Sequence, residues 1–440
     1  MENVINKFNL PNSLLVITSY PNPNGHRYGH RDLNAVAWHS EKTLKNISKD
    51  RRVIVLAEKA HDEDQSFYAN KNLYIKRVWS KTNHFSMLLI ILEVLKLNYI
   101  KSVLVPFEFN VFGGTVHNIF FLFVLAFMRL LGKKVVIEVH QVIEDIKELE
   151  KHINITNPLL QKFFDAGLKA YYFLFGLLAS DIIVFEQELK IRLAKYVDKD
   201  KIQVLSLATK KSKAVGKRSA RTTLGLPAKD FLVMVFGYIN GYKGIDFAID
   251  SFSRSKIRNA KLVVAGGKNP YLRDKKFYQR FYKKIMKHAK MSGRVVTTGF
   301  VPDNKVASYF SAADLVALPY EVFMSASGPF SLALSYGKPV ILSEKLIPYK
   351  ESSDFKEGMK YTGLNTKDLF FKLKRESFMT LIKKTKNSKK QMRKLSLFSK
   401  KLSEKRDSGK LDFEYKKILF KNNNPTFLKA KKKELKFIYN

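Results

Sequence analysis

The stretch AADLVALPYEVFMSASGPFSLALSYGKPVILS, residues 312–343, joins a strand, a Ser/Gly loop and a helix start. Its short apolar run, residues 315–318, predicts a buried parallel strand that leads into the loop at residues 319–328. Ser327 is a typical N-cap for the helix that follows, and a Gly-Lys-Pro turn predicts where this helix ends. Helix N-termini and the carboxyl ends of parallel strands both attract anions. We therefore expect free backbone N–H groups at Ser327 and Gly328 to form an anion site.

Length and composition predict two globular domains. The chain has 440 residues, 45% of them hydrophobic, which is too long for one ordinary core. It has no cysteine, which excludes disulfides, thiolate catalysis and cysteine-based zinc sites. The acidic group at residues 61–64 is typical of a solvated turn, and no second cluster completes a ligand set, so no metal site is expected.

The charge is strongly basic: 79 Lys and Arg oppose 39 Asp and Glu, a net charge of +40. Such a field favours an anionic partner, which could be nucleic acid, anionic lipid or a phosphorylated substrate, although a lysine-rich genome would also produce it. Residues 371–440 hold 23 Lys and Arg and 6 Asp and Glu, a net +17. This basic tail is predicted to hold the protein on an anionic membrane through interspersed apolar residues, namely Phe378, Leu395, Phe398, Phe420, Phe427 and Phe437. The alternative is that its aromatics pack on the first domain.

Targeting and membrane signals are weak. Residues 1–11 are polar, so no signal peptide is expected and the prediction is a cytoplasmic protein, peripheral on the inner face of the cell membrane. Two apolar runs, residues 119–128 and 170–179, are shorter than the roughly 20 residues that span a bilayer. They predict buried helices.

The order of secondary-structure signals predicts parallel sheets with crossover helices. In the first half, strands are expected at residues 14–19, 52–56, 103–106, 135–140, 182–185 and 201–205. Residues 208–221, rich in Lys, Ser and Gly, are the predicted linker. In the second half, strands are expected at residues 231–236, 262–265, 295–298, 315–318 and 340–342, and surface helices at 369–381 and 413–419. The predicted organisation is a first domain at 1–207, a second at 208–370 and a basic helical tail at 371–440.

The second half resembles the donor-binding domain of retaining glycosyltransferases of family 4, also called group 1. The motifs occur in the family's order: Phe236-Gly237, Lys243-Gly244-Ile245-Asp246, Gly299-Phe300-Val301, the Ser/Gly loop and Gly337-Lys338-Pro339-Val340. The resemblance implies an α/β protein of the GT-B fold, in which two Rossmann-like domains have parallel sheets facing across a cleft and the tail crosses back to the first domain. It also implies a metal-independent hexosyltransferase of polysaccharide biosynthesis that moves a sugar from a nucleotide diphosphate-sugar to a glycan or lipid-linked acceptor. No cofactor and no nucleic-acid partner are expected.

The same resemblance assigns roles to single residues. Lys243 is expected on the donor diphosphate and His140 on the transferred sugar, with Glu321 as the nearest carboxylate to that sugar. The expected donor-binding residues are Gly25, Gly237, Tyr238, Lys243, Val301, Ser325, Ser327 and Gly328. Residues 107–114, which include Glu108, are expected either to line the acceptor side or to form an ordinary loop.

Two departures from the family pattern keep other functions open. Tyr238 stands where the family usually has arginine, and the two usual glutamates fall near Met324 and Leu332. A chain of this kind is either a Ser-x-Ser-Gly variant of the enzyme or an inactive relative that binds nucleotide sugar or glycan. A nucleic-acid binder is the third hypothesis, but the sequence has no RNP-type or helix-turn-helix signature.

Overall fold

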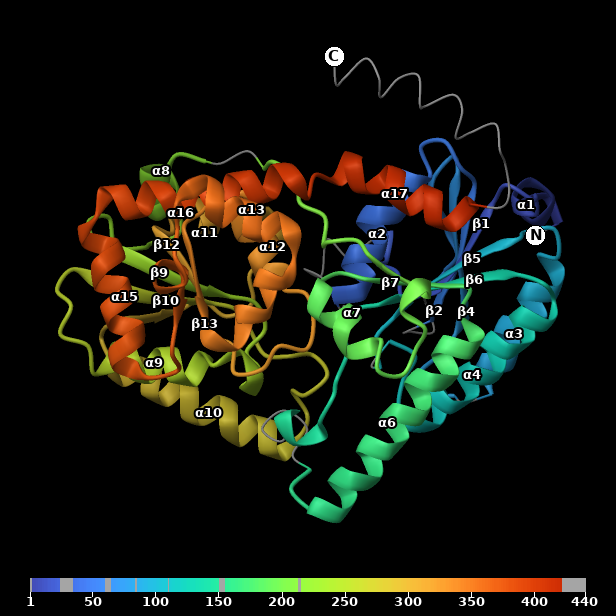
Figure 1. Ribbon diagram of the computed structural model, residues 1–440, viewed down its shortest axis with the longest axis horizontal. Coiled ribbons are helices and arrows are strands. Elements are labelled where there is room, and N and C mark those ends of the chain that lie inside the picture. Colours follow the sequence, from blue (N-terminus) through green and yellow to red (C-terminus); the bar gives the residue numbers. More distant parts are fainter. Residues whose placement is uncertain are drawn as a thin grey trace.

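The structure, a computed structural model, describes residues 2–23, 35–59, 65–83, 85–109, 111–149, 155–212 and 215–421. These residues form two sheets, each flanked by helices, that lie side by side in Figure 1. This arrangement is the α/β, GT-B-like architecture that the sequence predicts.

The first sheet has eight strands in the order β3-β4-β2-β1-β5-β6-β7-β8. All neighbours are parallel except the hairpin of β3 and β4. The strands are β1 (Leu14–Thr18), β2 (Val53–Glu58), β3 (Phe67–Asn70), β4 (Leu73–Trp79), β5 (Ser102–Phe107), β6 (Lys134–Val139), β7 (Asp181–Val184) and β8 (Ile202–Val204). Strand order reverses between β1 and β5, and ligands of open α/β sheets bind at the carboxyl ends beside such a reversal.

The second sheet has six parallel strands in the order β11-β10-β9-β12-β13-β14. They are β9 (Phe231–Phe236), β10 (Ala260–Ala265), β11 (Val295–Thr297), β12 (Leu315–Leu318), β13 (Val340–Ser343) and β14 (Phe370–Phe371). Here the order reverses between β9 and β12. The loops that follow these two strands therefore meet at the carboxyl edge of the sheet.

Helices cover both sheets. Those of the first half are α1 (Glu2–Phe8), α2 (Ala35–Ile47), α3 (Ser86–Lys96), α4 (Thr115–Leu130), η2 (Ile146–Leu149), α6 (Pro158–Leu178), α7 (Gln187–Leu193) and η3 (Lys199–Lys201). Those of the second half are α8 (Lys217–Thr223), η4 (Gly241–Lys243), α9 (Ile245–Ser253), α10 (Lys276–Met291), α11 (Asp303–Ala312), α12 (Gly328–Ser335), η5 (Glu344–Glu351), α13 (Ser353–Thr362) and α14 (Thr366–Leu369). The last three are α15 (Arg375–Asn387), α16 (Lys389–Lys405) and α17 (Ser408–Phe420).

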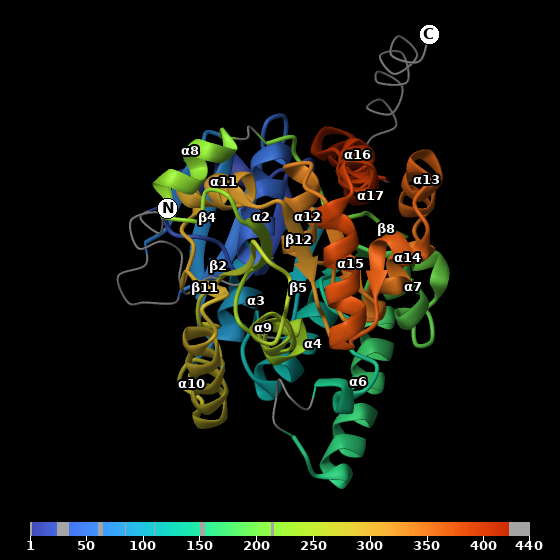
Figure 2. The same cartoon turned by 90° about the vertical axis from the view of Figure 1, so that its left-hand side faces the viewer.

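The C-terminal helices connect the two halves of the molecule. α16 packs on α12 and α13, whereas α17 packs on α2, β5 and β6. The two helices follow one another across the top of Figure 1 and overlap in Figure 2, where they are seen nearly end on. Between them, the buried Arg406 guanidinium binds Glu186 after β7 at 2.6 Å and Asp354 of α13 at 2.7 Å. One side chain thus ties both sheets and the tail together.

Several expectations about the elements are wrong. The linker predicted at residues 208–221 is partly helical, since α8 begins at Lys217. Arg221 of this helix is buried, and its guanidinium donates to the carbonyl of Ala312 and the carboxylate of Asp314. The predicted helix at 369–381 starts only at Arg375, because Phe370 and Phe371 pair with β13. β3 and β4 have no counterpart among the predicted strands.

The tail does not present the apolar residues that were expected to insert into a membrane. Phe378, Leu395, Phe398 and Phe420 are all buried, the first three in the main hydrophobic core. Phe427 and Phe437 lie outside the described residues. In the described part of the tail, these apolar side chains therefore pack on the two domains, as in the alternative to membrane insertion. The domain boundaries at 207 and 370 remain predictions.

Candidate functional site

The Ser/Gly loop runs from the end of β12 to the first turn of α12. The Ser327 hydroxyl accepts a hydrogen bond from the Phe330 N–H at 3.2 Å, so the predicted N-cap is confirmed. The Ser327 N–H, however, is not free as expected: it donates to the hydroxyl of Tyr349 at 3.2 Å. Among the described residues, the Gly328 N–H has no hydrogen-bond partner, and Gly328 is exposed. The amide of Gly328, and not that of Ser327, is available to an anion.

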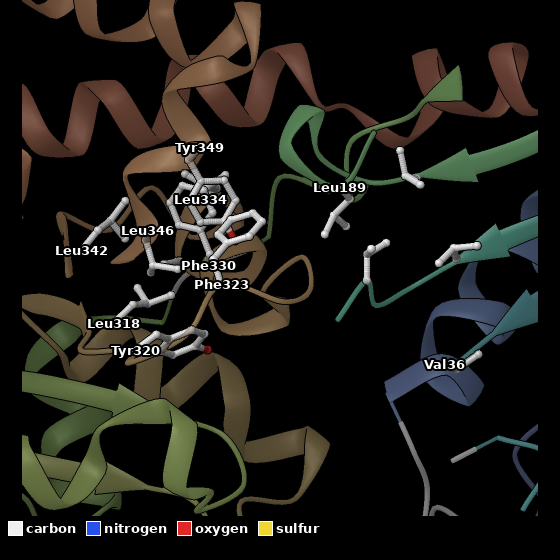
Figure 3. Close-up of a cluster of buried hydrophobic side chains, with 14 of the residues drawn as sticks. Val36, Leu189, Leu318, Tyr320, Phe323, Phe330, Leu334, Leu342, Leu346 and Tyr349 are labelled. Carbon is white, nitrogen blue, oxygen red and sulfur yellow. The ribbon is translucent and has the colours of Figure 1, made fainter. Parts of the chain in front are cut away.

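Aromatic side chains hold this loop in place. The Tyr320 hydroxyl lies 2.9 Å from the Ser327 hydroxyl, and burial raises the pKa of Tyr320 above its usual range. Figure 3 shows Phe323, Phe330 and Tyr349 close together beside the loop. Buried aromatic side chains therefore fix the conformation of the loop and the position of the first turn of α12.

The turn after β9 packs against the start of the same loop. Gly244 has φ +61°, and a Cβ there would lie 2.0 Å from the Pro319 carbonyl oxygen, so only glycine fits. The Glu321 N–H donates to the Tyr242 carbonyl at 2.7 Å. These contacts place η4 directly beside the Ser/Gly loop.

Lys243, in this turn, is a buried cation. The residue is 7% exposed, and its ammonium lies 5.9 Å from the ring centroid of Tyr242, with no hydrogen bond and no ion pair within the described part of the chain. Burial lowers the pKa of Lys243 to about 8. A Cβ on Gly237 would lie 3.0 Å from the Lys243 Nζ and 3.4 Å from Pro329 in the first turn of α12. A buried cation without an anionic partner among the described residues therefore lies close to the start of a helix, an arrangement that favours binding of an anion.

The other predicted donor residues are placed as follows. Tyr238 is half-buried, with its ring centroid 6.3 Å from that of Phe300, and Val301, directly after Phe300 in the sequence, is buried. Glu321 is half-buried in the loop after β12. Gly25 lies outside the described residues. The donor roles of all these residues remain predictions.

His140 comes from the first sheet, directly after β6. Its Nε2 lies 2.6 Å from Glu138 Oε1, and its ring contacts those of His39 and Phe185. Burial lowers the pKa of His140 despite the opposing effect of the Glu138 carboxylate, so the neutral imidazole is favoured. If Nε2–H donates to Glu138, Nδ1 is left as an acceptor for a ligand hydroxyl.

The polypeptide after His140 reaches the second domain. Gln141 forms an antiparallel bridge with Ser325, and the Val142 N–H donates to the Met324 carbonyl at 2.9 Å. The Met324 side chain is buried, and its Sδ lies 3.1 Å from Gln141 Nε2. The two domains therefore touch between the segment after His140 and the Ser/Gly loop. Met324, near which the family pattern has a glutamate, contacts the other domain instead.

The sequence did not indicate the buried cluster around Glu138. Both His39 and His140 place Nε2 near Glu138 Oε1, and the Tyr415 hydroxyl of α17 donates to Oε2 at 2.9 Å. Burial opposes ionisation, but the His39 charge and the imidazole hydrogen bonds hold the pKa of Glu138 well below its usual value. The ligand atoms of His39, Glu138 and His140 lie within 4.8 Å of one another, close enough to hold a cation. The Glu138 carboxylate is already hydrogen-bonded to His140 and Tyr415. The absence of a metal site stays a prediction.

Glu108 lies directly after β5, in the segment 107–114 that is predicted to line the acceptor side. Its carboxyl is a weaker acid than usual. Burial raises the pKa of Glu108 to about 7, and the nearby Lys81 lowers it only in part. The charge of Glu108 also acts on Tyr242 of η4, which places Glu108 near the second domain.

A cavity lined by Asp354, Arg406 and Glu414 lies away from these residues, and none of the predicted site residues lines it.

We expect the stability of the protein to fall as pH rises from about 5 to 8 because of Glu108. A carboxyl whose folded-state pKa is raised holds its proton more tightly in the folded state, so its contribution is lost as pH rises through the folded pKa. Glu108→Gln should remove this loss. Urea-denaturation midpoints of both proteins at the two pH values test this: the midpoint difference should favour the wild type more at the lower pH. A pH-independent difference would contradict the raised pKa.

The two sheets, built mainly of parallel strands, form a GT-B-like fold, and the buried Lys243 lies at the carboxyl edge of the second sheet. Residues 216–369, which include Lys243 and the Ser/Gly loop, match the family model of glycosyl transferases group 1. This part of the chain is therefore similar to the group 1 glycosyltransferases.

Solved structures support the fold over nearly the whole chain. Sucrose-phosphate synthase from Thermosynechococcus elongatus is similar with a TM-score of 0.69 and 13% identity, over 92% of this chain and 98% of that one. WaaG, a glycosyltransferase involved in lipopolysaccharide biosynthesis, has a TM-score of 0.63 and 14% identity, over 93% and 100%. HepE of Anabaena in complex with UDP has a TM-score of 0.61 and 14% identity, over 92% and 99%. No curated protein matches the sequence significantly.

Proposed function

We propose that this protein transfers a hexose, with retention of configuration, from a nucleotide diphosphate-sugar to a glycan or lipid-linked acceptor. The observation that carries the proposal is the buried Lys243, which has no anionic partner among the described residues and lies near the first turn of α12, where the Gly328 amide has no hydrogen-bond partner among the same residues. A diphosphate would compensate this cation, and HepE, which has a similar fold, was solved with UDP and with UDP-glucose. Gln141 and Ser325 hold the first domain against the same loop.

The chemistry needs little from the protein beyond electrostatics. As the sugar leaves, negative charge grows on the nucleoside diphosphate, and Lys243 with the Gly328 N–H would stabilise it in the manner of an oxyanion hole. A protein nucleophile is unnecessary if the acceptor hydroxyl attacks the anomeric carbon from the face that the diphosphate leaves, with its proton passing to the departing diphosphate oxygen. Nδ1 of His140 would accept a hydrogen bond from a hydroxyl of the transferred sugar, and Glu108 would face the acceptor.

The proposal is tested by measuring release of nucleoside diphosphate from a panel of nucleotide sugars, with and without candidate acceptors. Release above the background of the uncatalysed reaction supports a transferase. Tight binding of one nucleotide sugar without release supports the second hypothesis, an inactive relative, which the loss of a carboxylate at the buried Met324 favours. Absence of binding to every nucleotide sugar contradicts both.

We expect His140→Ala to lower turnover at least tenfold, equivalent to about 1.4 kcal/mol of transition-state stabilisation. The affinity for the free nucleoside diphosphate should change little, because the imidazole belongs to the first domain and faces the sugar. Initial rates at saturating donor, together with isothermal titration of the nucleoside diphosphate, separate the two effects. The half-exposed His288 of α10 provides the control His288→Ala, which should alter neither quantity. A parallel loss of turnover and nucleotide affinity would make the role of His140 structural.

A further inference from the structure

An apolar surface is exposed on three neighbouring helices of the first domain, α3, α4 and α6. α4 contacts both α3 and α6, and the three lie next to one another in the lower right of Figure 1. Each has one buried face and one exposed apolar face. The runs at 119–128 and 170–179, predicted to be buried helices, thus form helices that are only half buried.

The exposed residues recur at helical spacing, so each helix presents an apolar stripe. On α6 the stripe includes Leu159, Phe163, Phe173 and Leu177. On α4 it includes Val116, Ile119, Phe123 and Leu130, and on α3 it includes Leu88, Leu92 and Leu95. Leu130 is 85% exposed, Leu159 77% and Phe163 72%. Contiguous apolar surface of this kind marks a site of interaction.

The exposed charges on these helices are all basic. Lys96, Arg129, Lys162 and Lys169 are exposed, whereas the acidic residues of the three helices, Glu93 and Asp165, are only partly exposed. Glu93 is paired with Lys76 and Lys96, and Asp165 accepts the Ile146 N–H. Exposed apolar and basic side chains without exposed acidic ones are typical of helices that lie in the interface of an anionic bilayer.

The helices are suited to lie on a membrane and not to cross it. Among the described residues, no helix is both long and apolar enough to span a bilayer. A second copy of the chain is a poor occupant of this face, since each copy carries a net charge of +40 and would set like charges against each other. The chemistry of the face therefore fits anionic lipid.

The opposite side of α6 borders the proposed active site. Phe164 and Leu168 of α6 pack with Met324 of the Ser/Gly loop and with Tyr242 of η4. A bilayer that covers the exposed stripe of α6 would thus lie one helix away from the interdomain contact. We infer that α3, α4 and α6 form the surface by which this protein docks on anionic membrane, with α6 between the lipid and the cleft.

Vesicle co-sedimentation of the full chain tests this surface independently of catalysis. The probe is vesicles of phosphatidylcholine with and without phosphatidylglycerol. The variant Leu130→Ser, Leu159→Ser, Phe163→Ser removes three of the most exposed apolar side chains. Its matched control, Ile347→Ser, Tyr361→Ser, Leu397→Ser, removes exposed apolar side chains from the second half of the molecule. A charge pair, Lys162→Glu with Lys169→Glu, is matched by Lys356→Glu with Lys360→Glu on α13.

We expect the wild type and both control variants to bind anionic vesicles, with binding reduced by salt. The apolar triple variant and the Lys162/Lys169 variant should each bind at least tenfold more weakly, with thermal denaturation midpoints close to that of the wild type. No wild-type binding to anionic vesicles, equal binding to neutral ones, or unchanged binding of the triple variant would overturn the inference. Dissociation of a wild-type dimer by the triple substitution would also overturn it, since the face would then be an interface between copies.

Discussion

Lys243→Ala is expected to weaken binding of a nucleoside diphosphate by more than tenfold while the fold is retained. Removing one partner of a buried charge contact costs about 2 to 5 kcal/mol, which corresponds to a factor of roughly 30 or more in affinity. Isothermal titration with UDP and GDP measures the effect. Lys229→Ala is the matched control, because Lys229 is an exposed lysine before β9, at the opposite edge of the same sheet, and it should leave the affinity unchanged.

The pH dependence of binding gives a second signature of Lys243. Its pKa is lowered to about 8 by burial, so the ammonium is lost as pH rises through that value, and bound diphosphate would hold its proton in place. Wild-type affinity should therefore fall above about pH 8, whereas the weaker affinity of Lys243→Ala should not. An unchanged dissociation constant in the variant would contradict the site assignment.

Arg406→Met is expected to cost about 3 to 5 kcal/mol of unfolding free energy, the largest effect on stability that we predict. The substitution leaves Glu186 buried without its cation and removes the main partner of Asp354. Burial already raises the pKa of Glu186 although Arg406 opposes this, so the carboxyl would be more costly to keep ionised without the arginine. Urea denaturation at neutral pH measures the loss.

Lys405→Met is the matched control for Arg406→Met. Lys405 is the adjacent residue, and its ion pair with Glu357 is about 59% exposed on both sides. Solvent screens such a pair, so the control should lose no more than about 1 kcal/mol. Equal losses in the two variants would show that Arg406 does not hold the domains and the tail together.

Local signals in the sequence predicted the local parts of the site well. The strand before the Ser/Gly loop and the cap at Ser327 follow from residues within one or two turns of each other, and both are confirmed. The Ser327 N–H is taken by Tyr349, which lies 22 residues further along the chain, and nothing in the local pattern indicates this. Free amide N–H groups can be predicted from a helix start only when no distant hydrogen-bond acceptor folds back on them.

Long-range polar contacts could not be predicted for the same reason. Arg406 and Glu186 are 220 residues apart, and Tyr415 and Glu138 are 277 apart. In the sequence Arg406 is one of many basic residues in a tail that looks solvated. Likewise, hydropathy shows that α4 and α6 are apolar but not which of their faces lacks a covering element. Only the packing of the three helices reveals that a large part of this apolar surface is exposed.

A crystal structure of the protein soaked with UDP or GDP would show directly whether Lys243 and Gly328 bind the diphosphate. We expect a diphosphate with oxygens about 3 Å from both the Lys243 Nζ and the Gly328 backbone nitrogen, at the carboxyl edge of the second sheet. The His140 imidazole should lie on the side where a sugar would extend. A nucleotide bound elsewhere, such as in the cavity beside Arg406, with Lys243 left unpaired, would contradict it.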